Sequence, residues 1–150
     1  MRAPSALTDH LGYWLRAVSN HVSHAFAVRV AERGVTVAEW VMLRALYGKL
    51  PIPPSALAET MGVTRGAVTK LADRLIAKAL VLRRASAEDG RAQTLALTPK
   101  GARLVPDLAA LADRNDTDAF AALSRAERKT LETLLRRIAA DRGITAPPLD

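Results

Sequence analysis

Residues 54–98 constrain the fold most strongly, because they contain two short helices and then a hairpin, with almost no linker between these elements. PSALAETMG (54–62) starts with proline, which suits the first turn of a helix, and ends in glycine, which suits the position just past one. VTRGAVTKLADRLIAKAL (63–80) follows at once, with Thr64 as the predicted N-cap. Two helices joined by so short a turn indicate a helix-turn-helix.

The second of these helices has two unlike faces. Apolar side chains recur at 68, 71, 72, 75 and 79, the spacing of a buried helical stripe. Donors near the N-terminus of a helix can reach base edges in a DNA major groove, where glycine also lets the backbone approach phosphate. We therefore expect the polar and basic face to contact DNA through Thr64, Arg65, Gly66, Thr69, Lys70 and Arg74.

Residues 81–98 (VLRRASAEDGRAQTLALT) read as a β-hairpin, because two β-prone runs flank an Asp-Gly pair and glycine accepts the positive φ of a tight turn. Arginine at the tip would enter a narrow minor groove, whose negative potential attracts it. Asp89 is expected to orient Arg83 or Arg91. The predicted DNA contacts of this hairpin, or wing, are Arg84, Asp89, Gly90 and Arg91. A basic hairpin after a helix-turn-helix predicts a winged helix.

Charge supports a polyanionic partner. The chain carries a net charge of +7, and residues 62–104 hold nine lysines and arginines against three acidic residues. A basic segment of this kind is the electrostatic footprint of nucleic acid, although a solvated basic surface without a partner has the same composition.

The outer helices predict a dimer. We expect 5–33 and 99–143 to be dimerisation helices around a DNA-binding lobe at 36–98, with 144–150 as a flexible tail. The fold class is mainly α with a small β-hairpin wing. The outer helices carry more apolar surface than one small lobe needs, and a two-fold dimer would set two recognition helices about 34 Å apart. The alternative is a monomer whose outer helices pack on its own core.

A family pattern spans the hairpin and the helix after it: Asp89, Arg91, Leu95, Leu97, Thr98 and Gly101 make D-x-R followed by L-x-L-T-x-x-G. With LADRLIAKALVLRR upstream, the chain resembles the MarR family of bacterial winged-helix transcriptional regulators over nearly its whole length. The resemblance implies a homodimer on a pseudopalindromic operator, usually a repressor released by a small phenolic or anionic ligand. Two positions depart from the family: Ala79 replaces a frequent glycine, and Gly90 replaces a frequent second arginine.

A ligand pocket is a further hypothesis. If the first two helices face each other, their side chains would form an aromatic and cationic cleft for a benzoate-like anion. Ordinary core packing of the two tryptophans explains the same spacing and is the favoured reading. His21 and His24 could share one metal ion, but no third ligand is evident, so no metal site is expected. The pocket candidates are His10, Trp14, His21, Trp40 and Arg44.

The sequence lacks the residues that several classes of function require. Cysteine is absent, and no glycine-rich phosphate loop or G-x-S-x-G elbow occurs, so neither an enzyme nor a cofactor is expected. MRAPSALTDH is not a signal peptide, and no run approaches membrane-spanning length, so a cytoplasmic protein is the simplest expectation. Two rivals stay open: a small-molecule-binding helical dimer without a DNA role, and an RNA-binding winged helix.

Overall fold

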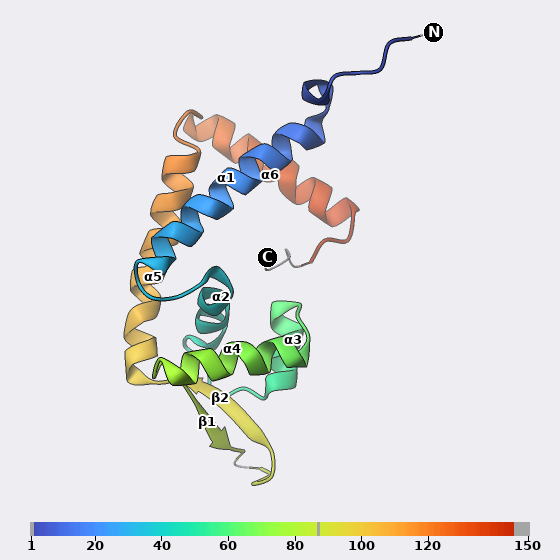
Figure 1. The fold of residues 1–150 in the computed structure, drawn as a ribbon. Coiled ribbons are helices and arrows are strands. Elements are labelled where there is room, and N and C mark those ends of the chain that lie inside the picture. The colour runs from blue at the N-terminus through green and yellow to red at the C-terminus, as the bar shows by residue number, and fades with distance from the viewer. Residues whose placement is uncertain (1, 87, 146–150) are drawn as a thin grey trace.

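The computed structural model describes residues 2–86 and 88–145, and Figure 1 shows a helical chain with a single hairpin in this part. The predicted tail at 144–150 lies mostly outside the described residues. In chain order the elements are η1 (Leu7–Asp9), α1 (Leu11–Ala31), α2 (Val37–Leu46), α3 (Pro54–Met61), α4 (Arg65–Ala77), β1 (Val81–Ala85), β2 (Gln93–Leu97), α5 (Pro99–Ala119) and α6 (Arg125–Asp141).

The first helix starts later than the predicted range of 5–33, at Leu11. An isolated 3-10 turn, η1, precedes it, and His10 is extended, with φ −97° and ψ 127°. The Asp9 carboxylate accepts the Ala6 backbone N–H at 2.8 Å, which closes the turn on itself. The helix expected at 5–33 is therefore wrong in its first residues, because η1 forms there and α1 begins at Leu11.

Side-chain caps fix where four helices begin, and Thr64 is among them, as predicted. Each capping hydroxyl satisfies a backbone N–H that has no partner inside its helix. The pairs are Thr36 with Glu39, Thr64 with Ala67, Thr98 with Gly101, and Ser124 with Glu127. In the first and last of these, the glutamate also accepts the N–H of the cap residue, which completes a capping box.

The hydrophobic core lies in the lobe formed by α2, α3, α4 and the hairpin, closed by the end of α1 and the first half of α5. The strands pair antiparallel from Val81 opposite Leu97 to Ala85 opposite Gln93. Ile52 adds a bridge, exchanging two backbone hydrogen bonds with Leu95 at 2.8 and 2.9 Å. The hairpin base is thus tied to the loop before α3, which confirms the winged helix-turn-helix fold.

The junction between α4, β1 and α5 is tightly built. Ala79 adopts the left-handed conformation, with φ 59°, and so keeps the C-terminal cap geometry that glycine normally supplies. The Thr98 hydroxyl donates to the Ala79 carbonyl at 2.7 Å. A Cβ on Gly101 would lie 2.1 Å from the Leu80 carbonyl oxygen, so this glycine lets α5 approach the start of β1.

The outer helices differ in how much of their surface the rest of the chain buries. The second half of α1 packs on α5, where the buried Asn115 donates to the Val22 carbonyl at 3.2 Å. By contrast, every residue of α6 is described and none is buried. Leu134, Leu135 and Ile138 form an exposed apolar stripe on α6. No helix among the described residues is long and apolar enough to span a membrane.

Candidate nucleic-acid interface

Helix α4 presents a basic face to solvent. Arg65 is its first residue, and Lys70 and Arg74 are exposed on later turns, while Val68 and Leu75 are fully buried on the opposite side. Because the amphipathic spacing of the sequence dictates which side is buried, the predicted polar face is the exposed one.

The three uncharged residues of this face have local roles as well. Thr64 accepts the Ala67 backbone N–H at 3.1 Å, and the Thr69 hydroxyl donates to the Arg65 carbonyl at 3.0 Å. Both hydroxyls are exposed and can still accept a hydrogen bond from outside. A Cβ on Gly66 would meet only the Thr64 hydroxyl, at 3.9 Å, so the surface above Gly66 is open.

An ion pair holds the wing beside α4. The guanidinium of Arg83 in β1 pairs with the Asp73 carboxylate of α4. Asp89 was expected to orient Arg83 or Arg91; Arg83 pairs with Asp73 instead, and Asp89 contacts the backbone of Arg91. Farther along the hairpin, the Thr94 hydroxyl donates to the Arg84 carbonyl at 3.3 Å, while the Arg84 side chain is exposed.

The wing tip is shaped by Asp89 rather than by glycine geometry. The Asp89 carboxylate accepts the Arg91 backbone N–H at 3.0 Å, and the Asp89 carbonyl accepts the Ala92 N–H at 3.0 Å. This is an Asx-type turn, in which an aspartate side chain stabilises the turn that follows it. Gly90 has no left-handed φ, so the expected reason for a glycine here is wrong. Arg91 is exposed at this turn.

At the other end of α4, Lys78 forms an ion pair with the buried Glu39 that the sequence did not predict. Lys78 donates to the Glu39 carboxylate at 2.7 Å and to the Gly34 carbonyl at 2.8 Å, and Glu39 is only 1% exposed. It ties the C-terminal end of α4 to the α1–α2 turn. The sequence contains a signal for this pair. Glu39 has the helical spacing of the buried residues Met42, Leu43 and Leu46, so it is an acidic residue on an apolar stripe.

The candidate pocket residues do not all meet within one chain. Trp40 packs edge-to-face on Phe26, with ring centroids 6.5 Å apart. Trp14 lies twelve residues before Phe26 on the same helix, roughly 18 Å along its axis. The side chains of Trp14 and Trp40 therefore do not line one pocket within a single chain.

The other pocket candidates are spread along the first two helices. His10 precedes α1, where its Nδ1 lies 3.3 Å from the Leu7 carbonyl, and His21 is exposed on the helix. Arg44 stacks over the Tyr47 ring, with its guanidinium carbon 5.9 Å from the centroid. Residues 2–86 and 88–145 contain no cluster of three potential metal ligands.

Comparison with known proteins agrees with this geometry. The family model described as "MarR family" matches residues 33–92. A relative from Thauera aromatica, named as a transcriptional regulatory protein for the hcr operon, is 33% identical over 89% of this chain and 81% of its own length. A mutant MarR of E. coli solved with operator DNA superposes with a TM-score of 0.75 and 26% identity, over 85% of this chain and 92% of that one. CouR of Rhodococcus jostii, solved with p-coumaroyl-CoA, gives 0.73 and 25%, over 91% and 96%.

The fold and its basic face define a winged-helix transcriptional regulator. An exposed helix of the helix-turn-helix and a hairpin beside it are the parts that such proteins bring to DNA. The chain belongs to the MarR family.

Proposed function

We propose that this protein is a homodimeric repressor that binds pseudopalindromic duplex DNA. Its recognition helix α4 lies in the major groove in this proposal, and its wing lies in the adjacent minor groove. The observation that carries the proposal is the ion pair between Asp73 and Arg83, because it joins a basic hairpin to the exposed basic face of α4.

The proposed contacts divide by chemistry. Arg65 and Lys70 stand near the start of α4 and read base edges, and Arg74 binds phosphate farther along the helix. Thr64 and Thr69 offer hydroxyls, and Gly66 lets the backbone approach. On the wing, Arg91 reads the minor groove, Arg84 binds phosphate, and Asp89 with Gly90 shapes the turn.

The proposed dimer follows from uncovered apolar surface. Leu11 is 80% exposed and Trp14 is 53% exposed on the first half of α1, and Ile138 is 49% exposed on α6. Since each large apolar side chain gains about 1.5–3 kcal/mol on full burial, a second copy covering both helices would stabilise them. A two-fold axis there repeats the recognition helix once on each half-site. The predicted dimerisation helices at 5–33 and 99–143 thus remain our proposal, with 36–98 as the DNA-binding lobe.

Selection of genomic DNA fragments on the purified protein tests the DNA proposal. The bound fragments should share a pseudopalindrome with half-sites about 34 Å apart. Arg65→Ala and Lys70→Ala should each cost about 1–3 kcal/mol of binding and relax sequence preference. Arg91→Ala should weaken binding to A·T-rich flanks. Arg114→Ala removes one exposed charge from α5 and serves as the matched control. Tighter binding to RNA than to duplex DNA, or no preference among duplexes, would reject the proposal.

Sedimentation equilibrium tests the dimer separately. Ile138→Asp should shift the protein toward monomer, whereas Thr133→Asp adds the same charge on an exposed position off the apolar stripe and should leave the mass unchanged. If the wild-type protein is a monomer at micromolar concentration, the proposed dimer and its pseudopalindromic DNA site are both refuted.

A small phenolic or anionic ligand that releases DNA is the remaining part of the proposal. Its support is the similarity to CouR, which was solved with p-coumaroyl-CoA. Titration of tryptophan fluorescence with salicylate, followed by DNA binding in the same samples, tests it. A ligand that binds without changing DNA affinity would refute release, because a ligand can shift an equilibrium only by its differential affinity for the two states.

A further inference from the structure

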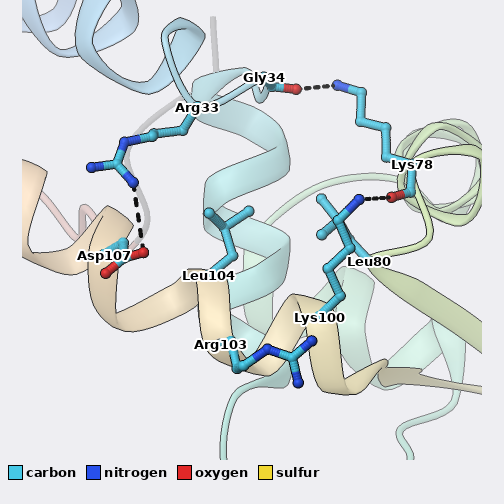
Figure 2. Close-up of a pocket in the computed structure, with 8 residues that line it drawn as sticks. All are labelled: Arg33, Gly34, Lys78, Leu80, Lys100, Arg103, Leu104 and Asp107. Atoms are coloured by element: carbon cyan, nitrogen blue, oxygen red, sulfur yellow. Dashed lines mark hydrogen bonds and ion pairs between the residues drawn. The ribbon is translucent and has the colours of Figure 1, made fainter.

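The recognition helix α4 is bonded to the outer part of the chain at its C-terminal end. Its C-cap residue, Lys78, donates to the Gly34 carbonyl of the α1–α2 turn at 2.8 Å and to the Glu39 carboxylate of α2 at 2.7 Å. The Lys78 carbonyl in turn accepts the Lys100 ammonium of α5 at 3.3 Å. Figure 2 shows the bonds that join Lys78 to Gly34 and to Lys100. One residue therefore connects the end of α4 to the α1–α2 turn, to α2 and to α5.

The N-terminal end of α4 has no comparable connection. Thr64 caps it by accepting the Ala67 N–H, a bond that stays within the helix. Asp73, farther along, joins α4 to the wing. Among the described residues, Lys78 is the one side chain of α4 and its caps that bonds to the α1–α2 turn or to α2. The proposed base-reading residue Arg65 thus lies at the end of α4 that these bonds leave free.

Stability alone does not account for the ion pair of Lys78 and Glu39. Glu39 is only 1% exposed, and taking a carboxylate out of water costs several kcal/mol, which a cation offsets only when the geometry is good. Apolar side chains of similar volume in place of a buried ion pair are often neutral or stabilising. The pair therefore calls for a role other than holding the lobe together.

Fixing the orientation of α4 is such a role. Val68 and Leu75 bury α4 on the core, but apolar contacts are non-directional and allow small shifts of the helix. Charge-assisted hydrogen bonds are short and have a preferred geometry, so the two bonds that Lys78 donates restrict these shifts. Because the bonds hold one end of the helix, a tilt about that end displaces Arg65 most.

We propose that Lys78 is a positioning residue, which acts through Glu39 and Gly34 to set the orientation of α4 for reading base edges. A binding site needs its side chains held within about 0.5 Å of their productive places by supporting hydrogen bonds. Lys78 lies roughly 20 Å from Arg65 along the helix, so it acts through α4 rather than on the same bases. The positioning role rests on the proposed function, since α4 enters the major groove only in that proposal.

The ratio of operator affinity to non-operator affinity tests this role. The test variant, Lys78→Met with Glu39→Gln, keeps the net charge and keeps an acceptor for the Thr36 N–H. It should bind the operator, a duplex taken from the selected genomic fragments, about tenfold more weakly, which equals the loss of about one base contact. Its affinity for a scrambled duplex of equal length, and the salt dependence of that affinity, should not change, because phosphate contacts depend on charge.

Two further variants make the comparison specific. Lys78→Arg keeps a cation that can donate to both partners, so its ratio should stay close to that of the wild type. Lys129→Met with Glu132→Gln makes the same two changes in an exposed pair on α6, 3.8 Å apart, and should leave both affinities unchanged. An unchanged ratio in the test variant would overturn the proposal. An equal fall in operator and scrambled-duplex affinity would also overturn it, because a smaller folded fraction lowers both alike.

A distance measurement without DNA separates the positioning role from the proposed function. The chain contains no cysteine, so Ser23→Cys on α1 and Thr69→Cys on α4 place one spin label on each helix at exposed positions. Double electron–electron resonance, with the labelled chain diluted in unlabelled chain, measures the distance between them. The test variant should give a broader or shifted distance distribution than the wild type. Equal distributions would overturn the positioning role whatever the DNA result, whereas a wild type without sequence preference would refute the proposed function.

Discussion

Replacing Gly101 by alanine should damage the fold at the junction of the recognition helix, the wing and α5. The new Cβ would lie 2.1 Å from the Leu80 carbonyl oxygen and 3.1 Å from its carbonyl carbon. Both atoms are backbone, so no side chain can rotate away. The start of α5 and the start of β1 must separate by roughly an ångström before the contact becomes an ordinary one.

The cost can be worked from the contacts that this separation strains. Thr98 bonds the Leu80 carbonyl through its N–H at 3.0 Å and the Ala79 carbonyl through its hydroxyl at 2.7 Å. Each such hydrogen bond contributes about 1 kcal/mol, and overpacking adds about 1–3 kcal/mol. The higher helix propensity of alanine returns somewhat less than about 1 kcal/mol. The variant should therefore lose about 3 kcal/mol of its free energy of unfolding.

Urea unfolding followed by circular dichroism measures this loss at one fixed protein concentration, because a dimer's stability depends on concentration. Gly66→Ala is the matched control. Its Cβ would meet nothing nearer than 3.9 Å, so the same chemical change should keep or raise stability by up to about 1 kcal/mol. A loss below about 1 kcal/mol for Gly101→Ala would refute the reasoning, because it would mean that the junction can relax without cost.

Three other variants probe local energetics. Ala79→Gly should stabilise the protein by about 1 kcal/mol in the same urea assay, because only glycine adopts φ 59° without strain; a loss of stability would contradict this. Lys78→Met should cost about 3 kcal/mol at neutral pH, since it leaves the Glu39 carboxylate buried without its cation, and adding Glu39→Gln should recover part of the loss. The Ser124 backbone N–H, and then its hydroxyl, hold the pKa of Glu127 below its ordinary value of 4.5, so the stability from this pair is fully present above pH 4.5 and is lost as the pH falls through the lowered pKa. Glu127→Gln should remove that pH dependence from the unfolding curves, and an unchanged acid slope would count against the pair.

Sequence patterns were sufficient wherever the controlling interaction is local. Capping hydroxyls, the proline and glycine that bound α3, and the buried stripe of α4 each depend on residues within a turn or two. They predicted the N-cap at Thr64, the helix-turn-helix and the exposed face with Arg65, Lys70 and Arg74. The pattern ending at Gly101 identified the family, and the clash with Leu80 gives the physical reason for its glycine.

Local rules were insufficient where two conformations compete within a few residues. Asp9 can cap a turn or continue a helix, and its bond to the Ala6 N–H selects the turn. The Asp89–Gly90 pair predicted a turn correctly but for the wrong reason, because the aspartate side chain supplies the stabilising bond. In both cases one side-chain hydrogen bond outweighs a statistical preference.

The sequence by itself determined the order of elements, their caps, the face of α4 that meets solvent and the basic character of the segment around it. Only the tertiary structure decided which charges meet: Arg83 with Asp73, and Lys78 with Glu39. Periodicity reports burial, because burial depends on a residue's own position along its helix. These two ion pairs join residues 10 and 39 positions apart, so they depend on how the helices pack, which no local pattern contains.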